Sequence, residues 1–185
     1  MNYDLVPRRY RVTDEQIDDG DLQAVITPLW WEVSIYDGET EMYDALDRFT
    51  DPQKYVWAIQ WYYSEVENGG HEQFFYNDTG IVWELALEGL REIGCTTFAG
   101  ILEEAAQRVG GYPSKDRETR WHEMSMHNAN FEDLDLKFYD REHELDQYLR
   151  DYIRSRREAF LFDGVVHFPE DYAPDEMEFD ESDDD

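Results

Sequence analysis

The side chains best suited to catalysis or metal binding in this sequence are one cysteine and five histidines. Cys95 follows Gly94 where a helix is expected to begin. A helix N-terminus can lower the pKa of a thiol, but a small buried cysteine is the commoner role. His122 and His127 are five residues apart and share a helical face poorly, which argues against a two-histidine metal site. The sequence has no HExxH, phosphate-loop or calcium-loop motif. We therefore expect no enzymatic activity, no metal and no cofactor.

A second group of polar side chains surrounds the double glycine within residues 61–77. The structural interpretation is a helix that ends at the glycines and is followed by an aromatic-rich turn or short helix. Asn68 would then take a left-handed position, and the side chains of Gln73 and Asn77 would satisfy backbone groups. The functional alternative is a small polar pocket with four ligand contacts: Asn68, His71, Gln73 and Asn77.

Charge dominates the composition of this chain of 185 residues. It has 45 acidic and 16 basic residues and a formal net charge of −29. Nucleic acids and anionic membranes are bound through lysine and arginine, so direct binding of either is not expected. The segment 169–185 contains acids but no base, which predicts a loosely held acidic tail. Residues 1–168 are acidic in their own right.

The remaining carboxylates are unevenly distributed, because residues 12–47 contain no lysine or arginine. Nine acids in this stretch are the candidates for binding a basic partner, the alternative being a solvated acidic face: Asp14, Glu15, Asp18, Asp19, Asp21, Glu39, Glu41, Asp44 and Asp47. Arg150, Arg154 and Arg157 line one face of a later helix. They form either a solvated or internally paired face, or a docking face for acidic segments of this chain or of a second copy.

Helical periodicity in the hydrophobic residues predicts an all-α fold of about seven to nine helices. We expect a single compact domain over residues 21–168, an N-terminal extension over 1–20 and the acidic tail. Apolar residues recur at helical spacing from Leu22 to Val33. Pro28 interrupts them, so either a helix starts there with Thr27 as its N-cap or two segments meet.

Capping residues predict the boundaries of the later helices. Thr40 could cap a short helix, Asp51 could cap a long one ahead of Pro52, and Ser114 another short one. Two helices are expected at 81–93 and 97–109, and one or two more between 131 and 157. The short apolar runs between 160 and 166 form either a small hairpin or an extended arm.

The segment from Glu65 to Asn77 resembles the signature of a bacterial family of small acidic helical proteins, the DNA-mimic-protein family. Its motif residues, which we expect to be structural, are Glu65, Asn68, Gly69, Gly70, Gln73 and Asn77. Further matching pieces are Trp30–Glu32, Ile35–Gly38, Gly80, Glu84, Ala86, Leu87, Gly89, Leu90, Ile93 and Gly94. The resemblance covers roughly residues 22–112. It implies an acidic dimer that imitates duplex DNA and occupies the DNA-binding surface of a helix-turn-helix regulator.

The density of charge is compatible with such mimicry. A globule of this length has a diameter of about 40 Å, and a duplex of that length carries about 24 phosphate charges. Carboxylates held on rigid helices could therefore present a DNA-like field to a basic DNA-binding protein and compete with DNA. The alternative is an immunity or adaptor module whose basic target is unrelated to DNA.

The sequence also supports predictions about the protein's cellular location and its oligomeric state. A single cysteine favours a reducing compartment, and no signal peptide or apolar run of about 18 residues is visible. We therefore expect a cytoplasmic protein. A surplus of aromatic residues, together with the resemblance, predicts a homodimer; the surplus includes Trp30, Trp31, Trp57 and Trp61.

Overall fold

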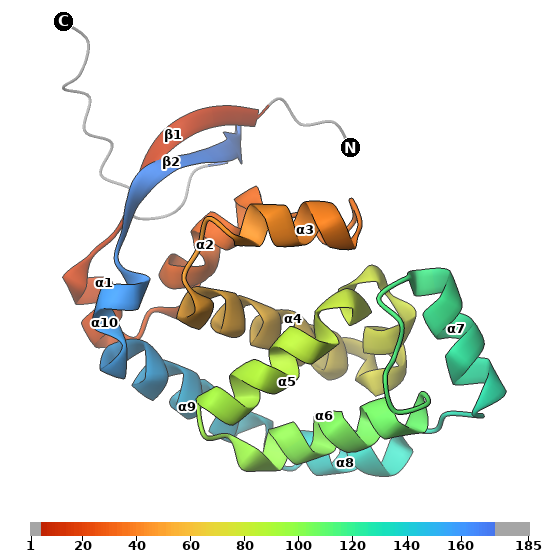
Figure 1. Ribbon diagram of the computed structural model, residues 1–185. Coiled ribbons are helices and arrows are strands. Elements are labelled where there is room, and N and C mark those ends of the chain that lie inside the picture. Colours follow the sequence, from red (N-terminus) through yellow and green to blue (C-terminus); the bar gives the residue numbers. More distant parts are fainter. Residues whose placement is uncertain (1–4, 173–185) are drawn as a thin grey trace, which may run out of the picture.

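The computed structural model describes residues 5–172 (Figure 1). The predicted all-α fold is confirmed, and this part of the chain adds one short two-stranded ribbon. Most of the acidic tail expected at 169–185 lies outside the described residues. The elements in chain order are β1 (Leu5–Val12), α1 (Asp14–Asp19), α2 (Leu22–Glu32), α3 (Glu39–Leu46), α4 (Asp51–Tyr76), the 3-10 helix η1 (Asp78–Val82), α5 (Trp83–Glu92), α6 (Thr96–Arg108), α7 (Arg117–Met126), α8 (Glu132–Tyr139), α9 (Glu142–Ser155), α10 (Arg157–Phe160) and β2 (Phe162–Pro169).

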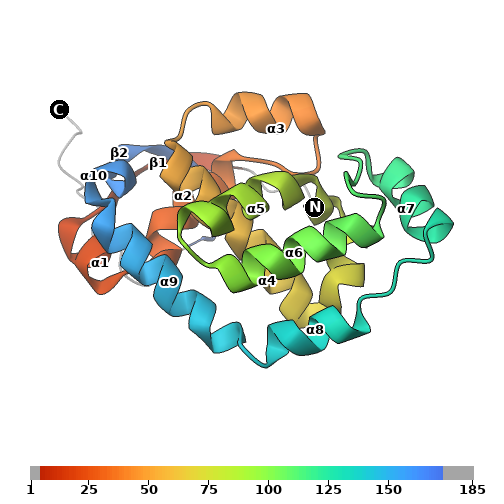
Figure 2. The ribbon, with the colours of Figure 1, turned by 60° about the horizontal axis from the view of Figure 1, so that its bottom comes forward.

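Helix α4 forms the centre of the fold. Its side chains Val56, Trp57, Ile59 and Tyr62 are completely buried, and α2, α5, α7 and α8 all pack against it. In Figure 2, α4 runs behind α5 and α6, with α8 near one of its ends. Within residues 5–172, no helix combines the length and the apolar composition that crossing a membrane requires.

The two ends of the described chain meet in an antiparallel ribbon. Strand β1 pairs with β2 from Leu5 opposite Pro169 to Val12 opposite Phe162. One face of this ribbon buries Tyr10, Val12, Val166 and Phe168 in the core. The apolar run after residue 160 is therefore not a hairpin but an extended, packed strand, and its partner strand comes from the other end of the chain.

Residues 5–20, the described part of the segment expected as an N-terminal extension, are packed on the helical body. Helix α1 buries Ile17 completely and begins at a capping box between Thr13 and Gln16. Because α1 falls inside residues 1–20, the expected number of helices did not include it. The described part of the chain therefore has ten α-helices rather than seven to nine.

Helix α2 passes through Pro28 without a break. Proline has no N–H, so the carbonyl four residues earlier loses its helical donor. That carbonyl belongs to Ala24, and the hydroxyl of Tyr10 donates to it at 3.0 Å. Strand β1 thus supplies the hydrogen bond that proline removes. Asp21, rather than Thr27, is the N-cap.

Three predicted caps are wrong by one or two residues. Helix α4 is capped by Thr50, which forms a reciprocal capping box with Gln53, so Asp51 is already inside the helix. Helix α3 starts after Gly38 rather than at Thr40, and Asp116 rather than Ser114 caps α7. In α4 the glutamine three residues after Thr50 is the stronger signal, because two backbone donors are satisfied together.

Candidate functional site

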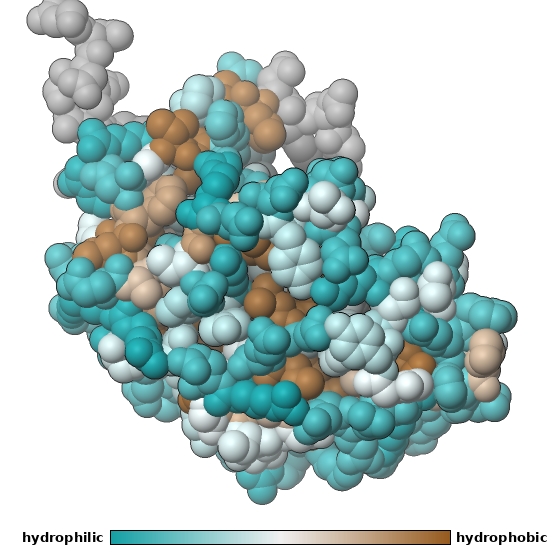
Figure 3. Space-filling model, viewed as in Figure 1, coloured by the Kyte–Doolittle hydropathy of each residue, from teal (hydrophilic) through white to brown (hydrophobic). Residues whose placement is uncertain are grey.

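All sixteen lysines and arginines of the sequence fall within the described residues, and each interacts with an oxygen of its own chain. Fourteen of them form ion pairs with carboxylates: Arg9, Arg11, Arg48, Lys54, Arg91, Arg108, Lys115, Arg117, Lys137, Arg141, Arg150, Arg154, Arg156 and Arg157. Arg8 and Arg120 donate to main-chain carbonyls. The lysines and arginines therefore hold parts of the fold together. The carboxylates that outnumber them give the surface its negative charge. Hydrophilic residues cover most of the face drawn in Figure 3.

The acids of α1, the first predicted binding stretch, lie against the arginines of α9 and α10. Arg157 pairs with both Asp14 and Asp18, and the Asp14 contact raises the pKa of this guanidinium. Arg150 and Arg154 donate to the last carbonyls of α1, at Asp18, Asp19 and Gly20, where cations are favoured by the helix dipole. Arg150 and Arg154 also pair with Asp146 and Asp151 of their own helix. The three-arginine face is thus partly paired within α9 and also docks an acidic segment of the same chain.

The other three acids of this first stretch behave differently. Glu15 and Asp19 are exposed, and Arg154 contacts the main-chain carbonyl of Asp19 rather than its carboxylate. Asp21 accepts a hydrogen bond from the backbone N–H of Ala24 at 3.0 Å and is the N-cap of α2. Helix α1 and its flanks therefore offer less free negative charge than their composition indicates.

Helix α3, the second predicted stretch, keeps most of its acids in solvent. Met42 and Leu46 are buried beneath it, whereas Glu41, Asp44 and Asp47 are exposed. No lysine or arginine of the described residues forms an ion pair with these three carboxylates. In Figure 1, α3 lies at the outside of the molecule, beside the ribbon.

Lys115 attaches this acidic helix to the body. Its ammonium group lies 3.1 Å from Glu39 of α3 and 3.3 Å from Glu84 of α5. The same group donates to the hydroxyl of Tyr43 at 3.1 Å. Although burial alone would lower it, the pKa of Lys115 is raised by these oxygen partners. Glu39 thus positions α3, and Glu41, Asp44 and Asp47 face solvent.

The double glycine produces a kink in α4, at the point where the sequence predicted that the helix ends. Gly69 and Gly70 leave helical geometry, and Gly70 has φ 74° and ψ −179°, a conformation open essentially to glycine alone. Across the kink, one oxygen of Glu65 accepts from the side-chain amides of Gln73 and Asn77, each at 2.9 Å. The family motif therefore joins the two halves of a bent helix. Two details of the prediction are wrong: within residues 5–172 Asn128, not Asn68, is the non-glycine residue with a positive φ, and Gln73 and Asn77 bind a carboxylate rather than backbone groups.

Helix α8 supplies the hydrogen-bond partners that the kink leaves unpaired. The N–H of His71 donates to Asp135 at 2.9 Å. The hydroxyl of Tyr139 donates to the Val66 carbonyl at 2.9 Å. Asp135 and Tyr139 are four residues apart and so face α4 together. Both residues were missed from sequence, since nothing near them indicates a bent helix 65 residues earlier.

The imidazole of His71 is completely buried. Its Nδ1 lies 2.5 Å from Asp135, and its Nε2 lies 2.9 Å from the hydroxyl of Tyr62. Gln73 and Asn77 bind Glu65 instead, and Asn68 is exposed. The four residues of the alternative polar pocket therefore do not converge on one cavity.

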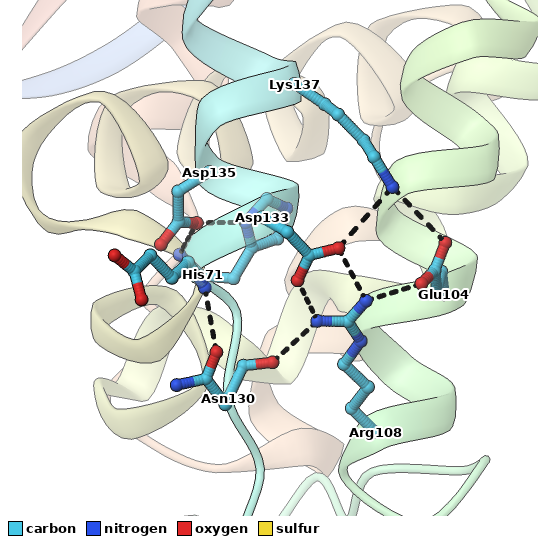
Figure 4. A network of polar contacts seen from close by, with 8 residues as sticks. His71, Glu104, Arg108, Asn130, Asp133, Asp135 and Lys137 are labelled. Carbon is cyan, nitrogen blue, oxygen red and sulfur yellow. Dashed lines mark hydrogen bonds and ion pairs between the residues drawn. The ribbon is translucent and has the colours of Figure 1, made fainter.

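Arg108 fixes the loop that leads into α8 (Figure 4). Its guanidinium donates to the main-chain carbonyl of Asn130 at 2.7 Å and to Asp133 at 2.5 and 3.0 Å. Glu104 accepts from the same group, and Lys137 approaches Asp133 at 3.5 Å. These contacts with Arg108 hold the pKa of Asp133 well below its usual range. Helix α8 is thus held to both α4 and α6.

The candidate nucleophile Cys95 is buried. Burial raises the pKa of its thiol to about 11, so the neutral thiol is the form present at pH 7. Within residues 5–172, no three histidine, cysteine or carboxylate side chains are grouped so as to hold a metal ion.

The helical fold and these surfaces define a class: a small, strongly acidic α-helical protein whose basic side chains are engaged by its own chain. The chain belongs to the DMP19-like protein family, whose model matches residues 47–156, more than half of its length. The match runs from the start of α4 through α9 and includes α8, which lies beyond the part of the chain in which the sequence resemblance was found. A search of curated proteins and a search of solved structures gave no match.

Proposed function

We propose that this protein is an acidic DNA mimic, a binding protein rather than an enzyme. Its partner is a basic DNA-binding protein, for example a helix-turn-helix transcription regulator. Exposed carboxylates occupy the surface on which that partner binds DNA, and the partner then releases its DNA. Membership of the DMP19-like family supports this assignment, as does a net charge of −29.

The observation that carries the proposal is the way the chain uses its cations. A DNA mimic needs negative charge that is not already neutralised by lysines and arginines of its own chain. The lysines and arginines interact with oxygens of the fold, so the charge of the exposed acids without an ion pair is available to a partner. Such a surface attracts basic proteins at long range and gives fast, salt-sensitive association.

Helix α3 and its C-cap Asp47 are the part of this surface that we propose to stand in for a row of phosphates. Glu41, Asp44 and Asp47 follow one another at intervals of three residues, or about 4.5 Å of helix rise. Phosphates along one DNA strand follow at about 3.4 Å of axis. The buried residues Met42 and Leu46 and the contacts of Lys115 hold the helix in place. The carboxylates therefore keep their spacing despite mutual repulsion.

The test begins by capturing the partner from a cell lysate at low salt and eluting it with 0.5 M salt. Labelled duplex DNA bound to the identified partner is then titrated with the full-length protein. We expect displacement of the duplex, with an affinity that falls steeply as salt rises. A ternary complex in which DNA stays bound would exclude mimicry. Capture of one basic toxin or nuclease, with no effect on DNA binding, would favour the immunity or adaptor alternative.

A matched pair of variants locates the surface. The double variant Asp44→Asn, Asp47→Asn removes two carboxylates that no cation of the described chain neutralises. The control, Asp14→Asn, Asp18→Asn, removes two carboxylates that are paired with Arg157. We expect the first variant to weaken competition and to reduce the salt slope by roughly one to two ions. The control should have the smaller effect on both.

A further inference from the structure

An open groove lies where the kink of α4 meets α8 and the loop before it. Its volume is about 320 Å³, and its lining includes Phe131, Leu136 and Tyr139 together with the acids Glu72, Glu132 and Asp135. The kink at Gly70 sets the direction of the helical turn that carries Glu72. Apolar walls and a carboxylate rim therefore occur in one depression of the surface.

The apolar walls are firmly placed. Phe131 is buried at the base, and the hydroxyl of Tyr139 is fixed on the Val66 carbonyl. Arg108 holds the adjoining loop through the carbonyl of Asn130. Leu136 is nevertheless 65% exposed, on a helix that is held from two sides. A rigid, solvent-exposed leucine next to a fixed aromatic ring is typical of a contact surface for another molecule.

The rim is negatively charged and open to a foreign cation. Among residues 5–172, no lysine or arginine forms an ion pair with Glu72 or Glu132. Lys137, which comes from the same helix, is directed to Asp133 and Glu104. Asp135 pairs with the buried His71. The two exposed glutamates at the mouth are therefore the groups that an incoming cation would meet.

We propose that this groove binds an arginine side chain from an amphipathic basic helix of the partner, with a neighbouring apolar residue packed on Leu136. The inference rests on the proposed function and names the kind of contact that anchors the partner. A planar guanidinium suits this site because it can stack on the ring of Tyr139 while donating to carboxylates. Lysine, a strongly hydrated point charge, fits such a site less well.

The groove is tested with a synthetic helical peptide that carries two arginines and two leucines on one face of an alanine–glutamine background. Binding to the full-length protein is measured by calorimetry, and the ring signals of Tyr139 are followed by NMR. We expect Leu136→Ser to weaken binding about fivefold to tenfold. Glu72→Gln together with Glu132→Gln should weaken it about fivefold. A peptide with lysine in place of arginine should bind more weakly to the wild-type protein.

Matched controls are available in the same chain. Leu161→Ser alters an exposed leucine between α10 and β2, and Glu88→Gln with Glu118→Gln removes two exposed acids from α5 and α7. Each should change peptide affinity about twofold or less. Circular dichroism checks that each variant is folded before its affinity is compared, and the NMR mapping on wild-type protein depends on no variant.

Equal losses for groove and control variants, or no movement of the Tyr139 signals, would overturn the groove assignment and leave only a general charge effect. Equal affinity for the arginine and lysine peptides would overturn the preference for arginine. Neither result bears on the proposed function, which is judged by displacement of duplex DNA from the captured partner.

Discussion

At the scale of single residues, Arg120 illustrates how this acidic protein uses a cation in its interior. Its side chain is completely buried. It donates to the main-chain carbonyls of Phe75, Asn77 and Ser114 at 2.6–2.7 Å. Burial lowers the pKa of Arg120 to about 10, so the guanidinium remains charged at pH 7. One arginine thus joins α7 and the loop before it to the end of α4.

Replacing Arg120 with methionine should lower the free energy of unfolding by at least about 3 kcal/mol, because several buried carbonyls lose their donors at once. Urea unfolding followed by circular dichroism provides the measurement. Arg91→Met is the control, since Arg91 forms an ion pair on the surface with Glu103, and its loss should cost less than about 1 kcal/mol. Similar values for the two variants would contradict a special role for Arg120.

Glu32 supports a prediction about pH. Its carboxylate accepts from the backbone N–H of His167 at 2.7 Å, from the imidazole of His167 at 2.9 Å and from Arg48 at 2.9 Å. Burial alone would raise the pKa of Glu32, but these hydrogen bonds outweigh it and lower the pKa below the ordinary 4.5. The folded protein therefore holds this proton less tightly than the unfolded chain does.

The resulting stability is present above pH 4.5 and is lost as pH falls below that value toward the folded pKa. We expect Glu32→Gln to be less stable than wild type at pH 7 and to lose less stability between pH 5 and pH 3. Urea midpoints at several pH values measure this difference. Glu41→Gln, at an exposed carboxylate, should follow the wild-type curve. Parallel curves for wild type and Glu32→Gln would refute the prediction.

At the scale of elements, the bend in α4 depends on side chains from α8. A Cβ atom at Gly70 would lie 2.5 Å from a carboxylate oxygen of Asp135, at a backbone φ of 74°. Gly70→Ala should therefore destabilise the protein by at least about 2 kcal/mol. Gly100→Ala lies in α6 with no atom near the added carbon and should stabilise by about 0.5–1 kcal/mol.

Thermal unfolding of these two glycine variants provides the comparison. Opposite changes in melting temperature are expected, because only Gly70 occupies a conformation that alanine avoids and a site that Asp135 fills. If Gly70→Ala were tolerated as well as Gly100→Ala, the kink would not be under the constraint described here.

At the scale of the whole molecule, assembly remains a prediction. Of the four tryptophans that suggested a dimer, Trp57 is completely buried in the core. Trp31 packs on Phe168. Trp30 is 37% exposed and stacks on Trp61 with ring centroids 4.3 Å apart. The apolar surface available for a dimer is therefore smaller than the composition indicated.

We still expect a homodimer at micromolar concentration in 0.15 M salt, and higher salt should favour it by screening the repulsion between two chains of −29. Sedimentation equilibrium at several salt concentrations measures this. Trp30→Ser should weaken the dimer if the exposed ring lies in the interface, with Tyr36→Ser at another exposed aromatic side chain as control. A single species of 22.2 kDa at all salt concentrations would exclude dimerisation.

The sequence alone determined the features that depend on near neighbours along the chain. Apolar spacing between Tyr55 and Val66 placed the central helix and its buried face, and Gly69-Gly70 marked the position at which its helical geometry is interrupted. The counts of acids and bases set the charge. The motif from Glu65 to Asn77 indicated the family, and the family model supports that identification. These features depend on residues close together in the sequence or on simple counts over the whole chain. They can therefore be predicted without knowing which distant segments are in contact.

Only the tertiary structure decided which charges remain available and how the bend is satisfied. Asp14 seemed as suitable for a partner as Asp44, but folding brings Arg157 onto Asp14, 143 residues away in sequence. Asp135 fills the space beside Gly70, and β1 meets β2 from the opposite end of the chain. Such pairings depend on the path of the whole backbone. A charged group or an unpaired N–H interacts with the group that the fold places within a few ångströms of it.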